Sequence, residues 1–231
     1  MQPPLDSPPV QAPMPSLRWG PAHVLVFLLA VDAVFFGLHL FHRFGIDAFL
    51  APQFNLTSEI GYAESFQHLK ELGIAASLLV LAVRVRSNSA ALWGLFFAYL
   101  MLDDSIEVHE SMGLWLSQEM ALSARWGLRA VDFGELVWSG FVAAVFALLL
   151  FAAWRQADPT SRRLVRHLLA LFAALAFFGV VVDMLHSVAN AHQIAGLGVV
   201  EDGGEMLVMS IIFAYAIGRL RQSGSSRTPG S

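Results

Sequence analysis

Carboxylates and histidines recur in this sequence at spacings that place them on single helix faces. Side chains three or four positions apart lie on the same side of an α-helix, so each such group presents its ligand atoms in one direction. The groups are Glu64, His68 and Glu71; Asp103, Glu107 and Glu110; Asp132 and Glu135; Asp183 and His186; and Glu201 and Glu205. Asp104 and His109 fall off the face of Asp103. They either serve a neighbouring helix or indicate that this helix unwinds near its outer end.

The chemistry that such a set favours is metal binding. Crowded carboxylates repel one another, so either several of them hold protons or multivalent cations neutralise them. Imidazoles among carboxylates suit iron, manganese or zinc, whereas all-oxygen shells suit calcium or magnesium. We therefore predict one or two divalent or trivalent transition-metal ions, with Glu107 or Asp132 as the catalytic general base. The predicted metal ligands are Glu64, His68, Asp103, Asp104, Glu107, His109, Glu110, Asp132, Glu135, Asp183, His186, Glu201 and Glu205.

The elements that must position these residues are apolar enough to lie in a membrane. The 231-residue chain is 56% hydrophobic and only 14% charged, whereas a soluble domain carries about 25% charged residues. The apolar residues form six blocks of roughly twenty residues, each able to cross a hydrocarbon core about 30 Å thick. The sequence predicts an all-α integral membrane bundle of about six transmembrane helices, at 21–42, 61–83, 90–112, 128–154, 164–190 and 201–220.

Two segments outside these spans are predicted to be disordered tails. Residues 1–20 hold six of the ten prolines, and residues 222–231 are rich in serine and glycine. Such compositions bury too little apolar surface to offset the entropy of ordering. The six-helix transmembrane domain is then expected at 21–221.

Charged residues give the orientation of the spans. Ten of the 14 Lys and Arg residues precede span one or follow spans two, four and six, and the positive-inside rule assigns that side to the cytoplasm. Both termini are then cytoplasmic (N-in and C-in). Counted from the cytoplasmic arginines at about 1.5 Å per residue, the grouped carboxylates and histidines of five spans reach one common layer. This layer lies in the outer, periplasmic half of the bundle.

Two motifs resemble those of a group of uncharacterised bacterial polytopic membrane proteins. In that group, one span carries an acidic pair shortly before a His-Glu dipeptide, as Asp103 and Asp104 precede His109 and Glu110 here. The last span opens with two acids and a following Glu-Met, as in residues 201–206 (EDGGEM). The resemblance covers spans three to six and implies a multi-pass protein of the bacterial inner membrane. It implies no activity.

Several function classes are excluded by what the sequence lacks. It has no cysteine, which rules out thiolate metal sites and cysteine nucleophiles. It has no HExxH motif, no GxxxxGK[ST] loop and no GxGxxG fingerprint, so neither zincin chemistry nor a nucleotide partner is expected. The net charge of −4 and the absence of a clustered Lys/Arg face exclude a nucleic-acid partner.

Two functions remain for a carboxylate and histidine layer in a lipid bilayer. The first is a metal-dependent enzyme, a hydrolase or oxidase acting on a lipid or other hydrophobic substrate. A loose similarity to ferritin-like di-iron bundles supports it, because Asp183-x-x-His186 is close to their Glu-x-x-His pairs. The alternative is a proton or metal-cation transporter or channel, since acids at membrane depth also mark ion pathways. A pathway should continue inward through polar residues, yet only Asp32, Ser77 and a few others lie below the layer.

Overall fold

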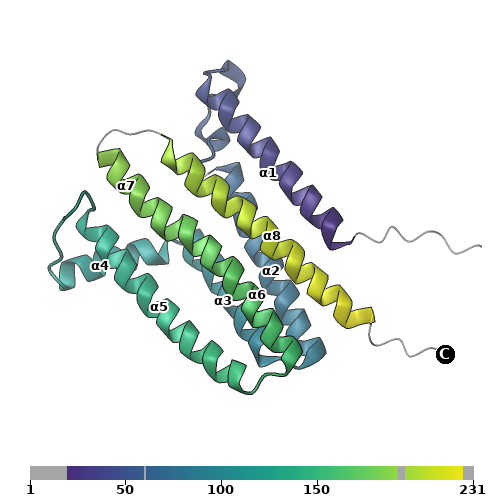
Figure 1. Ribbon diagram of the computed structural model, residues 1–231. Coiled ribbons are helices and arrows are strands. Elements are labelled where there is room, and N and C mark those ends of the chain that lie inside the picture. Colours follow the sequence, from purple (N-terminus) through teal and green to yellow (C-terminus); the bar gives the residue numbers. More distant parts are fainter. Residues whose placement is uncertain (1–19, 60, 192–195, 226–231) are drawn as a thin grey trace, which may run out of the picture.

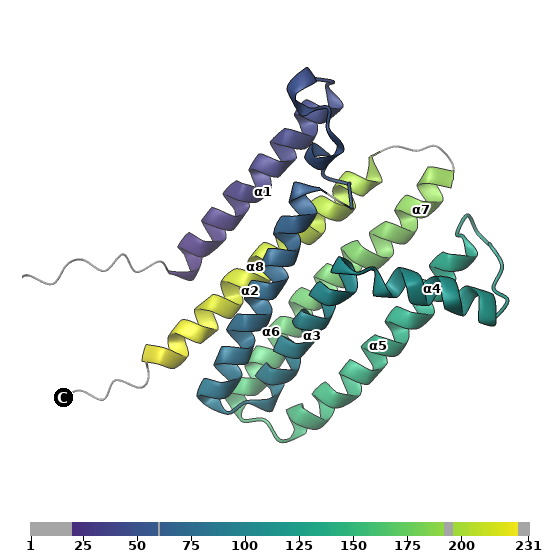
Figure 2. The same ribbon diagram turned by 180° about the vertical axis from the view of Figure 1, so that it is seen from behind.

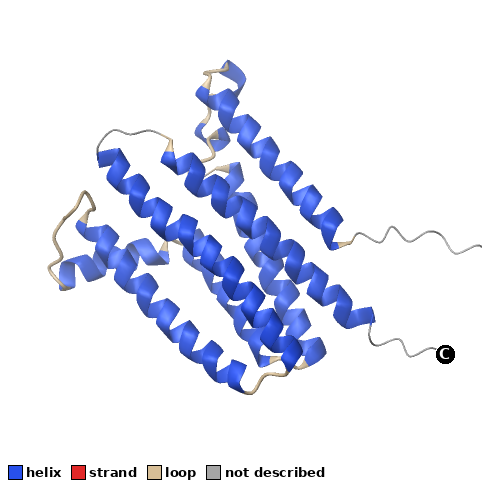
Figure 3. Cartoon of the chain, viewed as in Figure 1, coloured by secondary structure: helices blue, strands red, loops and turns tan. Residues whose placement is uncertain are grey.

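The computed structural model describes residues 20–59, 61–191 and 196–225, and this part of the chain is helical (Figures 1 and 3). Within it no strand forms beyond one isolated bridge between Arg125 and Leu128. The elements are α1 (Pro21–Arg43), η1 (Asp47–Phe49), η2 (Pro52–Phe54), α2 (Tyr62–Val85), α3 (Asn88–Ser105), α4 (Val108–Glu119), α5 (Ala130–Arg155), α6 (Pro159–Ala176), η3 (Phe177–Val182), α7 (Asp183–Ala191) and α8 (Leu197–Ser225).

The helices match the predicted spans except in the third one. The span expected at 90–112 divides into α3 and the separate 12-residue α4, which is too short to cross a membrane. At the C-terminus, α8 continues to Ser225, past the expected start of the tail at 222. The rest of that tail (226–231) and nearly all of the N-terminal one (1–19) lie outside the described residues.

In the described part of the chain, three helical stretches are long and apolar enough to span a membrane. They are Pro21–Arg43, Ala130–Arg155 and Pro159–Ala189, the last of which joins α6, η3 and α7 into one continuous helix. Large apolar side chains project outward from them, including Val26 on α1 and Leu148 on α5. Apolar side chains exposed around a long helix are typical of contact with lipid. The structure therefore has the character of a membrane protein.

The long helices run side by side (Figure 2). Polar and apolar residues separate along their length. One half of the bundle contains a packed apolar core around Trp93, Phe97, Leu78 and Ile212, all of which are fully buried. This half also contains the C-terminal ends of α2, α5 and α8, where the arginines cluster. The grouped acids lie in the other half, so the core closes one end of the bundle beneath them.

Asp158 determines where α6 begins. Its side chain accepts hydrogen bonds from the backbone N–H groups of Thr160 (2.7 Å) and Ser161 (3.1 Å) and from the Ser161 hydroxyl (2.8 Å). Pro159 follows at the first helical position, where its missing N–H costs nothing. The Ser161 hydroxyl also contacts that of Ser87, the N-cap of α3 (3.0 Å). This cap therefore joins the starts of α3 and α6.

We expect the Asp158→Ala variant to lose about 1 kcal/mol of unfolding free energy, because unpaired N–H groups remain at the start of α6. The Asp158→Asn variant should lose much less, since asparagine is also a good N-cap. The hydrogen bonds from Ser161 lower the pKa of Asp158 in the folded protein. The stabilisation is therefore present above the ordinary aspartate pKa and is lost as the pH falls through the lower, folded value. Denaturation in detergent at neutral and acid pH checks this, and an equal loss for both variants would contradict it.

Candidate functional site

The acidic end of the bundle begins where α3 breaks. Glu107 adopts a left-handed backbone conformation (φ 53°) between the end of α3 and the start of α4. The chain therefore changes direction, and α4 runs across the end of the bundle (Figure 2). The prediction that Asp103, Glu107 and Glu110 share one helix face is wrong, because no single helix contains them. The break instead fits the alternative that the span unwinds at its outer end.

The new direction of α4 places His109 against Asp103. The Asp103 carboxylate accepts from the Tyr99 hydroxyl (3.1 Å), and its other oxygen lies 3.1 Å from Nδ1 of His109. Trp138 Nε1 donates in turn to the Tyr99 oxygen (3.2 Å), which ties α3 to α5. The bond to Asp103 raises the pKa of His109 to about 9. At neutral pH His109 is therefore a cation, and a metal ion at Nδ1 would have to displace its proton.

Close packing holds α4 on α5. A Cβ atom at Gly134 would collide with the backbone carbonyl oxygen of Gly113, and one at Gly113 would collide with the side chain of Glu135. Small residues that allow helix backbones to approach closely are typical of helix contacts in membranes. This contact brings Glu135 of α5 next to the acidic residues of α4.

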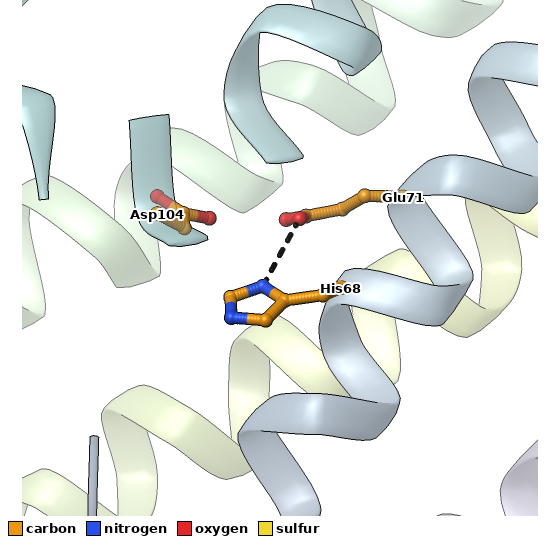
Figure 4. Close-up of side chains that lie close together, drawn as sticks. All are labelled: His68, Glu71 and Asp104. Carbon is orange, nitrogen blue, oxygen red and sulfur yellow. Dashed lines mark ion pairs between the residues drawn. The ribbon is translucent and has the colours of Figure 1, made fainter. Parts of the chain in front are cut away.

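A second group of ligands lies between α2 and the end of α3. His68, Glu71 and Asp104 each offer one ligand atom, and these atoms all lie within 4.8 Å of one another (Figure 4). The Glu71 carboxylate is 3.6 Å from His68 Nδ1, and its side chain is only 2% exposed. Among the described residues, neither Glu71 Oε2 nor His68 Nδ1 has a hydrogen-bond partner, although the Glu71 and Asp104 side chains are hydrogen-bonded to each other. Leaving buried polar atoms unpaired is costly.

Asp104 belongs to two groups at once. Besides His68 and Glu71, it lies close to Asp103 and His109. One ligand atom each from Asp103, Asp104 and His109 lies within 4.8 Å of the other two. Two potential metal positions thus share one carboxylate. A carboxylate placed in this way can bridge two ions.

A third group of ligands forms where α7 faces α8. Ligand atoms of Asp183, His186 and Glu201 lie within 4.8 Å of one another, and His186 Nδ1 is 2.7 Å from Glu201 Oε2. Asp183 follows directly after η3, a π-helical turn. Such turns insert one extra residue, re-aim the next side chains and occur often at functional sites. Here the turn also packs Gly179 against the Glu205 carboxylate.

A cavity of about 710 Å³ connects these groups. Its lining includes ten of the thirteen predicted ligands, and the structure therefore brings most of the predicted set to one place. The ten are Glu64, His68, Asp104, Glu107, His109, Glu110, Glu135, Asp183, Glu201 and Glu205. Asp103 and His186 do not line the cavity, but each is hydrogen-bonded to a residue that does. Asp103 is bonded to His109, and His186 is bonded to Glu201. Two further acids, Glu59 and Asp202, also line the cavity but were not predicted as ligands.

Asp132 lies outside the cavity lining and is bonded to Arg129. Its two oxygens accept from the backbone N–H (2.8 Å) and the guanidinium (2.8 and 2.6 Å) of Arg129. The Asp132 side chain is 1% exposed and does not line the cavity. Both of its oxygens bond to Arg129 at the start of α5, and its roles as general base and metal ligand stay predictions. Glu107, at the break between α3 and α4, does line the cavity.

A buried ion pair lies beside the site and was not predicted. Lys70, the only lysine of the chain, places Nζ 3.1 Å from the Asp32 carboxylate of α1. Its ammonium also donates to the Met206 carbonyl (2.9 Å) of α8, and the Ser210 hydroxyl donates to the other Asp32 oxygen (2.6 Å). The pair joins α1, α2 and α8. Its sequence signal was the mid-span Asp32, which needs a cationic partner at the same depth.

Comparison with known proteins identifies a family but no activity. Residues 22–218 match the model of a family described as a domain of unknown function (DUF8692). No curated protein and no solved structure matches the chain. Because the family match extends over most of the sequence, the chain belongs to the DUF8692 family.

Proposed function

We propose that the protein binds one or two transition-metal ions in the acidic half of its bundle and uses them in an enzymatic reaction on a hydrophobic substrate. The observation that carries this proposal is the pair of ligand groups that share Asp104, together with the unpaired, buried Oε2 of Glu71. Hydrogen bonding within the protein satisfies most buried polar atoms. A cation bound between His68, Glu71 and Asp104 would satisfy the unpaired Glu71 Oε2 and His68 Nδ1.

The donor set favours iron, manganese or zinc. Imidazole nitrogen and carboxylate oxygen are the ligands that these ions share, whereas calcium and magnesium prefer oxygen alone. Two ions bridged by a carboxylate can hold and polarise a substrate oxygen between them. Glu107 is the proposed general base, because it lines the cavity at the break between α3 and α4.

A one-sided enzyme fits the bundle better than a transporter. A transport path for protons or metal cations would have to continue from the cavity to the arginine-rich end. Among the described residues, that half is filled by the apolar core around Trp93 and Phe97. The charges of Lys70 and Asp32, the ion pair that joins α1, α2 and α8, neutralise each other.

We further propose a six-span topology in the bacterial inner membrane, with both termini in the cytoplasm. Besides the three apolar stretches, α2, α3 and α8 have 24, 18 and 29 residues, or about 27 to 44 Å of helix at 1.5 Å per residue. Arginines at one end of the bundle give the orientation. The metal site then faces the periplasm.

Thiol labelling tests this topology, since the chain has no native cysteine. Cysteine placed at Asp47 or Glu119 should react with a membrane-impermeant maleimide in intact spheroplasts. Cysteine at Gln156, in the loop between α5 and α6, should react only after permeabilisation. The reverse pattern would place the acidic half in the cytoplasm.

Metal analysis of the purified protein tests the proposed function itself. Stoichiometric iron, manganese or zinc is expected, and its removal should destabilise the fold because the crowded carboxylates lose their counter-ion.

A further inference from the structure

The cavity extends sideways between two of the apolar helices. Its lining includes Ser139, the tenth residue of α5, and Gly179 and Val180 of η3. Ser139 lies about 14 Å along α5 from the start of that helix, and both Ser139 and Gly179 are exposed. The lining therefore reaches well into two of the membrane-spanning stretches.

The two walls of this extension do not close on each other. The main partner of α5 is α4, and the contacts of α5 with α6, η3 and α7 are sparse. Both views show α5 and the α6–η3–α7 helix joined by a loop at one end of the bundle and running beside each other from there (Figures 1 and 2). Exposed apolar side chains flank the opening, with Phe141 on α5 and Val181 on η3. We call this opening between Ser139 and Gly179 the side slot.

Polarity changes along the cavity. Leu136, Ser139 and Val180 in the side slot carry no charge, the Glu205 carboxylate lies against Gly179 at its inner edge, and the bundle end contributes the other carboxylates and the histidines. A ligand with an apolar chain and a compact polar head fits this gradient, because the chain remains in contact with the bilayer while the head reaches the acidic groups.

The charge of the cavity restricts that head group. Among the described residues of the lining, ten carry a carboxyl group, Arg129 is the one lysine or arginine, and His68 and His109 are the imidazoles. Two divalent ions, Arg129 and the protonated His109 would together supply six positive charges against ten carboxyl groups, which leaves the wall acidic. An anionic phosphate would be repelled, whereas an uncharged or cationic head would be accepted.

We propose that the substrate is a bilayer lipid with a phosphate-free, uncharged or cationic head group, and that it enters through the side slot. This inference deepens the proposed metal-dependent function and rests on it for the chemistry. The slot and its charge preference, however, concern binding alone, so they are measured without turnover.

A single cysteine in the slot reports on occupancy. The Ser139→Cys variant, in phosphatidylcholine nanodiscs, is labelled with a water-soluble maleimide in the presence of one of three C16 probes: hexadecyltrimethylammonium, monopalmitoylglycerol or hexadecyl phosphate. Ser123→Cys, in the exposed loop after α4, is the matched control for reagent reactivity. We expect the cationic or the uncharged probe to slow labelling of the Ser139→Cys variant at least fivefold. Labelling of the Ser123→Cys variant should not change, and hexadecyl phosphate should protect neither thiol.

Two results would overturn the inference. One is protection by hexadecyl phosphate equal to that by the other probes, and the second is the absence of selective protection of the Ser139→Cys thiol by any probe. Bound metal is measured in the same samples. If metal is bound but no probe selectively protects the Ser139→Cys thiol, the side slot alone is contradicted. If a probe protects this thiol selectively but no metal is bound, the proposed metal chemistry alone is contradicted.

Discussion

Replacing Lys70 with methionine should lower the unfolding free energy by about 3 to 5 kcal/mol, the usual cost of removing one partner from a buried ion pair. Lys70 is 1% exposed and is bonded to Asp32 and to the Met206 carbonyl. Without its ammonium group, the Asp32 carboxylate would remain in an apolar environment with only the Ser210 hydroxyl as a donor. Unfolding in mixed micelles measures the loss.

The double variant Lys70→Met/Asp32→Leu separates the pair from simple packing. Apolar side chains of similar volume often replace a buried pair without loss, so the double variant should recover most of the stability of the parent protein. A double variant that is less stable than Lys70→Met alone would show that the pair is not what holds α1 to α2 and α8.

The second large effect is expected at Asp104. The Asp104→Asn variant should bind metal at least tenfold more weakly than the parent protein, because it weakens a ligand that both groups share. Replacing a residue that only orients a metal ligand, without touching the metal, already lowers metal affinity about 10-fold to 100-fold. The metal-free variant should also be more stable than the metal-free parent, since one carboxylate of a crowded set becomes neutral.

The matched control makes the same chemical change at the opposite end of the bundle. Asp158→Asn removes one negative charge while keeping the helix cap, so its metal content should equal that of the parent protein. Elemental analysis of both variants checks the prediction. Equal metal content in Asp104→Asn and the parent would contradict the role of Asp104.

The sequence predicted the helices well because their signals are local. Apolar length and flanking arginines located five of the six expected spans as single helical stretches, and i, i+3 and i, i+4 spacings located the cavity walls. The break at Glu107 was harder to predict, because glutamate carries no glycine or proline signal for a left-handed residue. Only the poor fit of Asp104 and His109 to the face of Asp103 indicated it.

Contacts between distant segments account for the other differences. Asp132 and Glu135 have the same i, i+3 spacing as a ligand pair, yet Arg129 engages Asp132 as a cap and leaves Glu135 to line the cavity. Lys70 reaches Asp32 across 38 positions of sequence. Spacing gives the direction of a side chain, whereas its partner depends on how the helices pack.

The metal content of the purified protein tests the central claim most directly. Protein prepared in mild detergent without added chelator is analysed by element-specific mass spectrometry, and its thermal midpoint is measured before and after chelation and after metal is restored. We expect one or two equivalents of iron, manganese or zinc per chain, a lower midpoint after chelation, and recovery that depends on metal concentration. A protein that purifies without stoichiometric metal, and whose midpoint is the same with and without chelator near neutral pH, would contradict the claim.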